Sequence, residues 1–268
     1  MKTKPLVRYP GSKSRKTKKL TSMFPTFTGT YYEPFIGSGV ISIYQQETNP
    51  NRKIVINDVY WDLYNLWVNV QQNGKQLVDR CITIRDKYDP NQPLGKELFN
   101  EMTELYNNGD NLDKAISFFV RNKIGFSGVG GVSKSAYQKT FNNGNTLKLL
   151  EISNIIKDFE IYNLDYEIVL KDVNVNDFVF LDPPYDIKDM LYGKNGEIHK
   201  GFDHKRFCDV VKRLPCQWMI TYNDNEKLRE WFKKYTIIEE EYDYCMSFET
   251  TDEGKKQRKK IELIIKNY

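Results

Sequence analysis

The sequence predicts an α/β fold in which an open, mostly parallel sheet is interrupted by one long, mainly helical insertion. Short segments rich in β-branched and aromatic residues alternate with helical patterns towards both ends of the chain. This alternation is typical of parallel sheets, because each strand is linked to the next through a helix. Between residues 60 and 150 the strand signals stop and helical patterns follow one another. The expected strands are 30–36, 53–58, 159–166, 177–182, 217–223, 236–244 and 261–267.

Helical patterns fall between several of these strands. "GVISIYQQE" follows the first strand, and "LKLLEISNIIKDF" precedes the third. "DHKRFCDVVKRL" and "NEKLREWFKKY" flank the fifth, and we expect Asp203 and Asn225 to be their N-caps. No long helix separates the last two strands, so we expect an antiparallel pair at that end.

The insertion begins with four helical patterns and ends in a polar segment. The patterns are "WDLYNLWVNVQQ", "GKQLVDRCITIRDKY", "GKELFNEMTELYNN" and "NLDKAISFFVRNK". "IGFSGVGGVSKSAYQKTFNNGN" then follows, rich in glycine, serine, asparagine and basic residues, which indicates an exposed loop. We therefore predict one domain from residues 1–60 and 150–268, and an inserted subdomain from residues 61–149.

Composition favours a soluble globular protein that works in a reducing compartment. The chain has 268 residues, of which 40% are hydrophobic and 28% charged. Its four cysteines form no C-x-x-C pair, and its two histidines do not lie at zinc-ligand spacing from them. A zinc site and a thiol–imidazole catalyst are therefore not expected. We find no secretory signal or apolar membrane span, and we expect a cytoplasmic location.

The net charge of +4 is modest, but basic residues are concentrated in two clusters, "SKSRKTKK" (12–19) and "KKQRKK" (255–260). Each cluster taken alone is compatible with a solvated surface. Both are also compatible with contacts to a phosphate backbone, which needs exposed lysine and arginine.

A glycine motif and a later acid predict a binding site for a nucleoside-containing cofactor. "EPFIGSG" (33–39) follows the first strand and precedes a helix, where Gly37 and Gly39 would let the backbone approach a ligand. Ser42 stands at the third glycine position of the dinucleotide fingerprint, so a tight structural turn is the alternative. Asp58 ends the next strand, about 20 residues on, where a carboxylate can accept both ribose hydroxyls.

"FVFLDPPYD" (178–186) places an acid, two prolines and an aromatic ring at the end of a buried strand. The prolines restrict the backbone on either side of them. The Asp182 carboxylate and the Pro183 carbonyl could accept the two hydrogens of an exocyclic amine, while Tyr185 offers a ring for a planar base. A rigid turn that carries a surface acid is the alternative.

The order of these motifs resembles a known family. "RYPGSK" (8–13), "FIGSG", a long insertion and "DPPY" look like the Dam-type, alpha-group (D12 class) DNA adenine-N6 methyltransferases. The resemblance implies a Rossmann-like S-adenosylmethionine-dependent methyltransferase sheet with a target-recognition subdomain in residues 61–149. It also implies site-specific transfer of a methyl group to the N6 amine of an adenine flipped out of double-stranded DNA. It further suggests a monomer or weak dimer without a metal, in a restriction-modification or phage setting.

Site residues are carried over from the family position by position. The resemblance assigns catalysis to Asp182, Pro183, Pro184 and Tyr185. It assigns cofactor binding to Tyr9, Gly11, Lys13, Pro34, Phe35, Gly37, Ser38, Gly39, Asp58, Asp165, Tyr166 and Asp182. It assigns DNA contacts to Arg121, Asn122, Lys123, Phe126, Ser127, Lys134 and Lys139.

Other functions remain open at this point. The same fold acting on cytosine N4 more often carries serine at the position of Asp182, and enzymes acting on RNA or protein glutamine usually carry asparagine there. A catalytically idle DNA-binding relative and a NAD-dependent oxidoreductase are further alternatives. "VGGVSKSAYQKTFNN" replaces the segment typical of GATC-reading members, so the resemblance does not extend to a GATC target.

Overall fold

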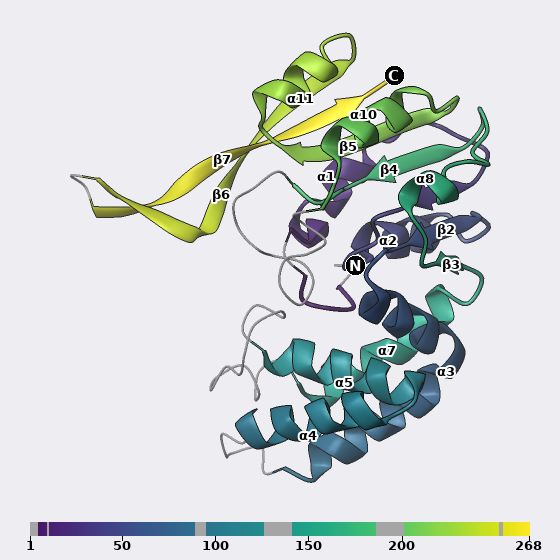
Figure 1. The fold of residues 1–268 in the computed structure, drawn as a ribbon, viewed down its shortest axis with the longest axis vertical. Coiled ribbons are helices and arrows are strands. Elements are labelled where there is room, and N and C mark those ends of the chain that lie inside the picture. Colours follow the sequence, from purple (N-terminus) through teal and green to yellow (C-terminus); the bar gives the residue numbers. More distant parts are fainter. Residues whose placement is uncertain (1–4, 10, 89–94, 126–140, 186–200, 252–253) are drawn as a thin grey trace. The chain divides into compact units, whose positions relative to one another are not determined.

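The computed structural model describes residues 5–9, 11–88, 95–125, 141–185, 201–251 and 254–268 (Figure 1). Between residues 242 and 260 it describes the backbone alone. The chain divides into two compact units, one of residues 1–23 and 33–169, the other of residues 24–32 and 170–268. Within the described ranges, no helix is both long and apolar enough to cross a membrane.

The strands form a seven-stranded sheet in the order β3-β2-β1-β4-β5-β7-β6. The pairs β2/β3, β1/β4 and β4/β5 are parallel, whereas β5/β7 and β6/β7 are antiparallel. The prediction of a mostly parallel, Rossmann-like sheet with an antiparallel end is thus confirmed. The bounds are β1 Tyr31–Glu33, β2 Ile54–Asn57, β3 Glu160–Tyr162, β4 Phe178–Leu181, β5 Gln217–Asn223, β6 Thr236–Thr251 and β7 Gly254–Lys266.

The first unit is mainly helical and includes β2 and β3. Its helices α3, α4, α5 and α7 form the lower bundle in Figure 1, in which α3 packs against both α5 and α7, and α4 packs against α5. The helical elements are η1 Lys13–Arg15, α1 Thr17–Thr21, α2 Val40–Thr48, α3 Trp61–Asp86, α4 Gly95–Asn108, α5 Asn111–Ile124, α7 Asn143–Ile155 and α8 Tyr166–Val169.

Helix α3 joins two helices that the sequence predicts separately. The break falls at Asn73, whose φ of −123° and ψ of 22° are not helical. Its side-chain amide donates to Asn69 Oδ1 at 2.9 Å, which stabilises the kink. The neighbouring Gly74 lies against α7, where an added Cβ would come within 2.5 Å of Ser153 Oγ. The predicted interruption is therefore a kink with close helix packing rather than a loop.

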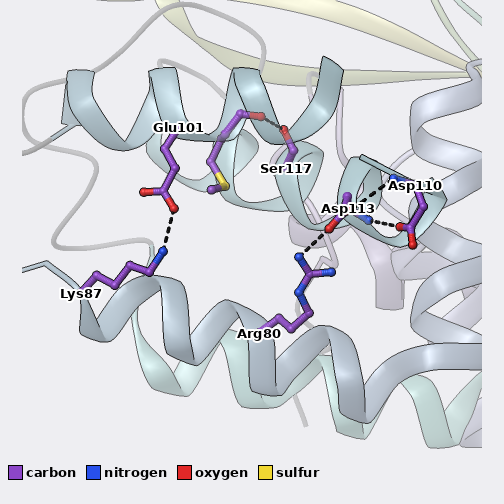
Figure 2. A network of polar contacts seen from close by, with 7 residues as sticks. Arg80, Lys87, Glu101, Asp110, Asp113 and Ser117 are labelled. Carbon is purple, nitrogen blue, oxygen red and sulfur yellow. Dashed lines mark hydrogen bonds and ion pairs between the residues drawn. The ribbon is translucent and has the colours of Figure 1, made fainter. Parts of the chain in front are cut away.

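Polar side-chain contacts link α3, α4 and α5 (Figure 2). Arg80 on α3 pairs with Asp113 on α5 at 2.5 Å, and the Ser117 hydroxyl donates to the Met102 carbonyl of α4 at 2.5 Å. Asp113 also forms a capping box with Asp110, in which each carboxylate accepts from the other residue's backbone N–H. Because this box satisfies orphan donors at the start of α5, it stabilises the helix that ends at residue 124.

The second unit contains β4, β5, β6 and β7 with α10 His204–Lys212 and α11 Glu226–Trp231. All four residues of β4 are buried, as its apolar sequence predicts. The predicted N-caps are confirmed, since Asp203 accepts from the Arg206 N–H and Asn225 from the Lys227 N–H, both at 2.9 Å. Buried β4 ends where the polar turn 182–185 begins.

The two compact units do not coincide with the predicted domains. Residues 61–149, the predicted insertion, belong to the same unit as residues 33–60 and 150–169. Compactness reports how segments pack and does not assign a function to them. The division into a catalytic domain of residues 1–60 and 150–268 and a recognition subdomain of residues 61–149 therefore stays a prediction.

We expect Asp110→Ala to lower the free energy of unfolding by about 1 kcal/mol, because it removes the side-chain acceptor at the start of α5. Thermal melting followed by circular dichroism measures the effect. Asp79→Ala is the matched control, since Asp79 forms only an exposed pair with Lys75 on one helix face. Equal melting temperatures for the two variants would contradict the role of the capping box.

Candidate active site

The glycine motif of the first unit forms a left-handed turn at the start of α2. Gly37 has a φ of 47° and Gly39 a φ of 70°, and Gly39 is the N-cap of α2. A Cβ on Gly39 would overlap the Trp67 ring, and one on Gly37 would meet Tyr9 Cδ1 at 3.3 Å. Both positive φ angles favour glycine, and at Gly39 the space beside Trp67 requires it as well. Ser42, at the third glycine position, is buried and donates its hydroxyl to Glu33.

Asp58 faces this turn from the end of β2. Its carboxylate accepts from the Gly37 N–H at 3.2 Å and from the Tyr60 N–H at 3.0 Å, one hydrogen bond on each oxygen. Burial raises the pKa of Asp58 to about 6, although both N–H groups act in the opposite direction. Each carboxylate oxygen can accept more than one hydrogen bond, so the group is suited to a pair of ligand hydroxyls.

Asn57 is a residue of this site that the sequence reasoning missed. Its side-chain amide donates to the Pro34 and Leu164 carbonyls, both at 3.0 Å, and its oxygen accepts from the Leu164 N–H at 2.9 Å. One buried amide therefore ties the glycine turn to the turn that precedes α8. The sequence could have pointed to Asn57, because it is the polar residue of the otherwise apolar strand "IVIN".

Predicted cofactor residues gather around these two turns. Asp165 accepts from the Glu167 N–H at 2.9 Å and so begins α8. The Tyr166 ring lies beside the Phe35 ring, with centroids 5.4 Å apart. Large apolar side chains are exposed nearby in sequence, with Val59 55% and Leu164 39% exposed. Rings and apolar side chains of this kind offer contacts to a planar base.

The N-terminal motif also lies against the glycine turn. The Ser12 and Ser38 hydroxyls are hydrogen-bonded at 2.8 Å, and the Leu6 N–H donates to the Ser38 carbonyl at 3.3 Å. Lys13 is buried, and its ammonium donates to the Gly11 carbonyl at 3.0 Å. The structure therefore brings the predicted residues Tyr9, Gly11 and Lys13 together with Gly37 and Ser38.

Two of the predicted DNA-contacting residues form hydrogen bonds to other residues of the first unit. Asn122 is buried and exchanges two hydrogen bonds, each 2.8 Å, with the backbone of Arg8. Lys123 is buried and donates to the Leu6 carbonyl at 2.9 Å, and burial lowers its pKa to about 8. These side chains hold the N-terminal segment to α5, which sequence reasoning did not foresee. Their predicted DNA contact stays a prediction.

Arg121 differs from its two neighbours because it is half-buried. Its guanidinium lies over the Phe99 ring at 4.9 Å and over the Tyr106 ring at 5.9 Å. Such stacking restricts an arginine side chain while it stays charged. The other predicted DNA-contacting residues, Phe126, Ser127, Lys134 and Lys139, lie outside the described residues.

In the second unit, Asp182 is held by two hydroxyl groups. Thr221 Oγ1 donates to Asp182 Oδ1 at 2.8 Å, and Tyr185 Oη contacts the same oxygen at 2.9 Å. Pro183 and Pro184 connect Asp182 to Tyr185 and restrict the backbone between them. The predicted acid and the predicted ring are therefore joined directly in the structure.

The Tyr185 hydroxyl also contacts a second carboxylate, Glu262 on β7, at 2.8 Å. Burial raises the pKa of Tyr185 well above its ordinary value, and Asp182 and Glu262 raise it further, so the phenol keeps its proton. The Tyr185 ring stacks on Tyr222, with centroids 5.2 Å apart and 29° between planes, and the Tyr222 hydroxyl in turn contacts His204 Nδ1.

Sequence reasoning missed Thr221 and Glu262. Thr221 lies in the predicted strand 217–223, but its place beside Asp182 follows from the parallel register in which Leu181 pairs with Ile220. The place of Glu262 follows in the same way from the antiparallel register in which it pairs with Asn223. In the part of the chain that the structure describes, no His, Cys, Asp and Glu side chains are grouped to hold a metal.

Comparisons with known proteins show to which sequences the chain is similar. The sequence profile of the D12 class N6 adenine-specific DNA methyltransferases matches residues 9–246. The chain is 25% identical over 205 residues to "Type II methyltransferase M.MjaIII" of Methanocaldococcus jannaschii, covering 69% of this chain and 70% of that protein. It is 23% identical to "Type II methyltransferase M1.LlaDCHI" of Lactococcus lactis subsp. cremoris, covering 99% and 95%. It is 28% identical to "DNA adenine methylase" of Haemophilus influenzae, covering 48% and 43%.

We expect Gly39→Ala to lower the free energy of unfolding by about 2 kcal/mol or more. An alanine there combines a strained positive φ with an overlap against the buried Trp67 ring, so that either Trp67 or the backbone must shift. Chemical denaturation measures the loss. Gly144→Ala is the control, because Gly144 has no positive φ and an added Cβ would lie 3.5 Å from Asn142. A stable Gly39→Ala variant would contradict this account of the turn.

Proposed function

Because the chain belongs to the D12 class N6 adenine-specific DNA methyltransferases, we propose that it methylates adenine N6 at specific double-stranded DNA sites, with S-adenosylmethionine as the donor. The observation that carries the proposal is the turn 182–185, in which two hydroxyls hold the Asp182 carboxylate beside the Tyr185 ring. This arrangement suits a planar base that carries an exocyclic amine.

The residues of the first unit fit the proposed donor. Asp58 presents a carboxylate next to a left-handed glycine turn, the combination that suits a ribose near a closely approached backbone. Phe35 and Tyr166 would contact the adenine ring of the donor, and Asp165 lies at the start of the same turn. Bound S-adenosylmethionine would supply an electrophilic methyl group on a positively charged sulfur.

The residues of the second unit would orient the target amine. Asp182 and the Pro183 carbonyl would accept the two N6 hydrogens, and this withdraws the nitrogen lone pair from conjugation with the ring. Tyr185 would stack on the flipped base, whose extrusion costs a few kcal/mol. The chain therefore contributes mainly positioning and electrostatic stabilisation. No strong base is required, because the nitrogen releases its proton readily once it is methylated.

Several basic side chains would contact the DNA backbone. In the cluster 12–19, Arg15, Lys18 and Lys19 are exposed, whereas Lys13 is buried. Phosphate contacts of this type position a protein on DNA without reading its sequence. We assign base reading to the segment after α5 and to Arg121, which the Phe99 and Tyr106 rings hold in place.

The assignment of Asp182 predicts the outcome of a labelling assay. Unmethylated DNA incubated with the protein and labelled S-adenosylmethionine, then digested to nucleosides, should carry label in N6-methyladenine. Asp182→Ala should reduce the rate at least about 100-fold, because an oriented acceptor is lost. Asp209→Ala, a change at an exposed acid on α10, is the control. Label in N4-methylcytosine, or undiminished label with Asp182→Ala, would overturn the proposal.

The raised pKa of Asp58 predicts that cofactor affinity depends on pH. The ionised carboxylate is the form that accepts both ribose hydroxyls, so binding should be strongest above about pH 6. Below that pH the affinity should fall by about tenfold per unit, as protonation competes with binding. Calorimetric titration with S-adenosylhomocysteine measures this, and Asp58→Asn should bind weakly without that dependence. Asp158→Asn, which changes an exposed acid, should keep it.

A further inference from the structure

Glu262 is a buried carboxylate on the strand next to the proposed base-binding turn. It is 5% exposed and lies on β7 beside the apolar residues Leu263, Ile264 and Ile265. Burying a carboxylate is costly unless hydrogen bonds compensate. Glu262 pairs in register with Asn223 at the end of β5, two residues beyond Thr221. The strand register thus brings it to the same end of the sheet as Asp182.

The hydrogen bond of Glu262 goes to the hydroxyl that also contacts Asp182. Tyr185 Oη lies 2.8 Å from Glu262 Oε1 and 2.9 Å from Asp182 Oδ1. A phenol has one hydrogen, so the two carboxylates share a single donor between them. Thr221 supplies a separate hydrogen to Asp182 at 2.8 Å. The side chains of Thr221, Asp182, Tyr185 and Glu262 therefore form a continuous polar network.

Several contacts restrain Tyr185, including the one between its hydroxyl and Asp182. Pro183 and Pro184 restrict the backbone before it, and Tyr222 stacks on one face of its ring. Glu262 holds the far end of the ring through the hydroxyl. Loss of the Glu262 contact would remove one of the two carboxylates, Glu262 and Asp182, that the hydroxyl contacts, and stacking on Tyr222 does not by itself fix the in-plane position of the ring.

We propose that Glu262 is a positioning residue for adenine methylation, which fixes the Tyr185 hydroxyl and through it the Tyr185 ring and the Asp182 carboxylate. The proposal rests on the function proposed above, because it assumes that Asp182 and Tyr185 receive the target base. Glu262 acts through Tyr185 and is not assigned any contact with the base or the donor. The length of the Glu262 side chain, rather than its negative charge, is the property on which this positioning depends.

The effects of side-chain length and of charge at Glu262 can be separated by substitution. Glu262→Gln keeps the length of the side chain and an oxygen that accepts from Tyr185, but removes the charge. Glu262→Asp keeps the charge but shortens the side chain by one methylene. Glu262→Leu removes both. Glu239→Leu is the matched control, because Glu239 lies on the neighbouring strand β6 and pairs with Arg229 at the surface.

We expect Glu262→Asp and Glu262→Leu to lower kcat by about 10-fold to 100-fold, since a displacement of about 1 Å has an effect of that size. Glu262→Gln should keep at least about a third of the wild-type kcat, and KM for S-adenosylmethionine should change by less than about twofold in all three. In a Tyr185→Phe background, Glu262→Asp should have no further effect on kcat, because the hydroxyl that links the two residues is absent. Glu239→Leu should match wild type.

The possible outcomes separate this proposal from the proposed function. Failure of the wild-type protein to methylate adenine would refute the proposed function itself. An active wild type together with fully active Glu262→Asp would refute the role of Glu262 alone, as would Glu262→Gln less active than Glu262→Asp. Additive effects of Glu262→Asp and Tyr185→Phe would also refute it. Thermal melting of each variant establishes whether it is folded. If Glu262→Leu does not fold, the comparison of Glu262→Gln with Glu262→Asp tests the proposal.

Discussion

Polar groups at the buried ends of parallel strands must find hydrogen-bond partners, and the candidate sites of this protein follow from that constraint. β2 ends in Asn57 and is followed by Asp58, and β4 is followed by Asp182. Each side chain is satisfied by a particular neighbour, which fixes the local backbone as well. Asn57 joins two turns of the first unit, and Thr221 and Tyr185 hold the acid of the second.

The two acids are held by different donors, and this difference suits different tasks. Asp58 accepts from backbone N–H groups, and burial raises its pKa, so it is a fixed acceptor beside a turn of backbone. Asp182 accepts from side-chain hydroxyls, so its orientation depends on the rotamers of Thr221 and Tyr185. A network of this kind is strong when complete and loses much when one member is removed, which is why Glu262 matters in our account.

The helical part of the first unit shows how a family resemblance can point to a segment but not to the role of each side chain. α5 carries three of the residues to which the resemblance assigns DNA contacts, yet two of them, Asn122 and Lys123, hold the N-terminal segment by its backbone. The buried Lys123 ammonium donates to the Leu6 carbonyl, and burial lowers its pKa to about 8. Arg121, on the same helix, is instead stacked on two rings.

The sequence by itself determined what depends on neighbouring residues along the chain. Segments rich in β-branched and aromatic residues predicted each strand, although β6 runs on to Thr251 and β7 begins at Gly254, beyond the predicted bounds. Asp203 and Asn225 predicted two helix starts, and the glycine and proline motifs predicted both candidate sites. Only the tertiary structure decided what depends on residues far apart. The partnership of Tyr185 with Glu262, 77 residues away, follows from an antiparallel register that no local pattern encodes. The burial of Asn122 follows from the path of residues 6–8, and the kink at Asn73 from the packing of α7, since contact between distant segments is set by how the whole chain packs.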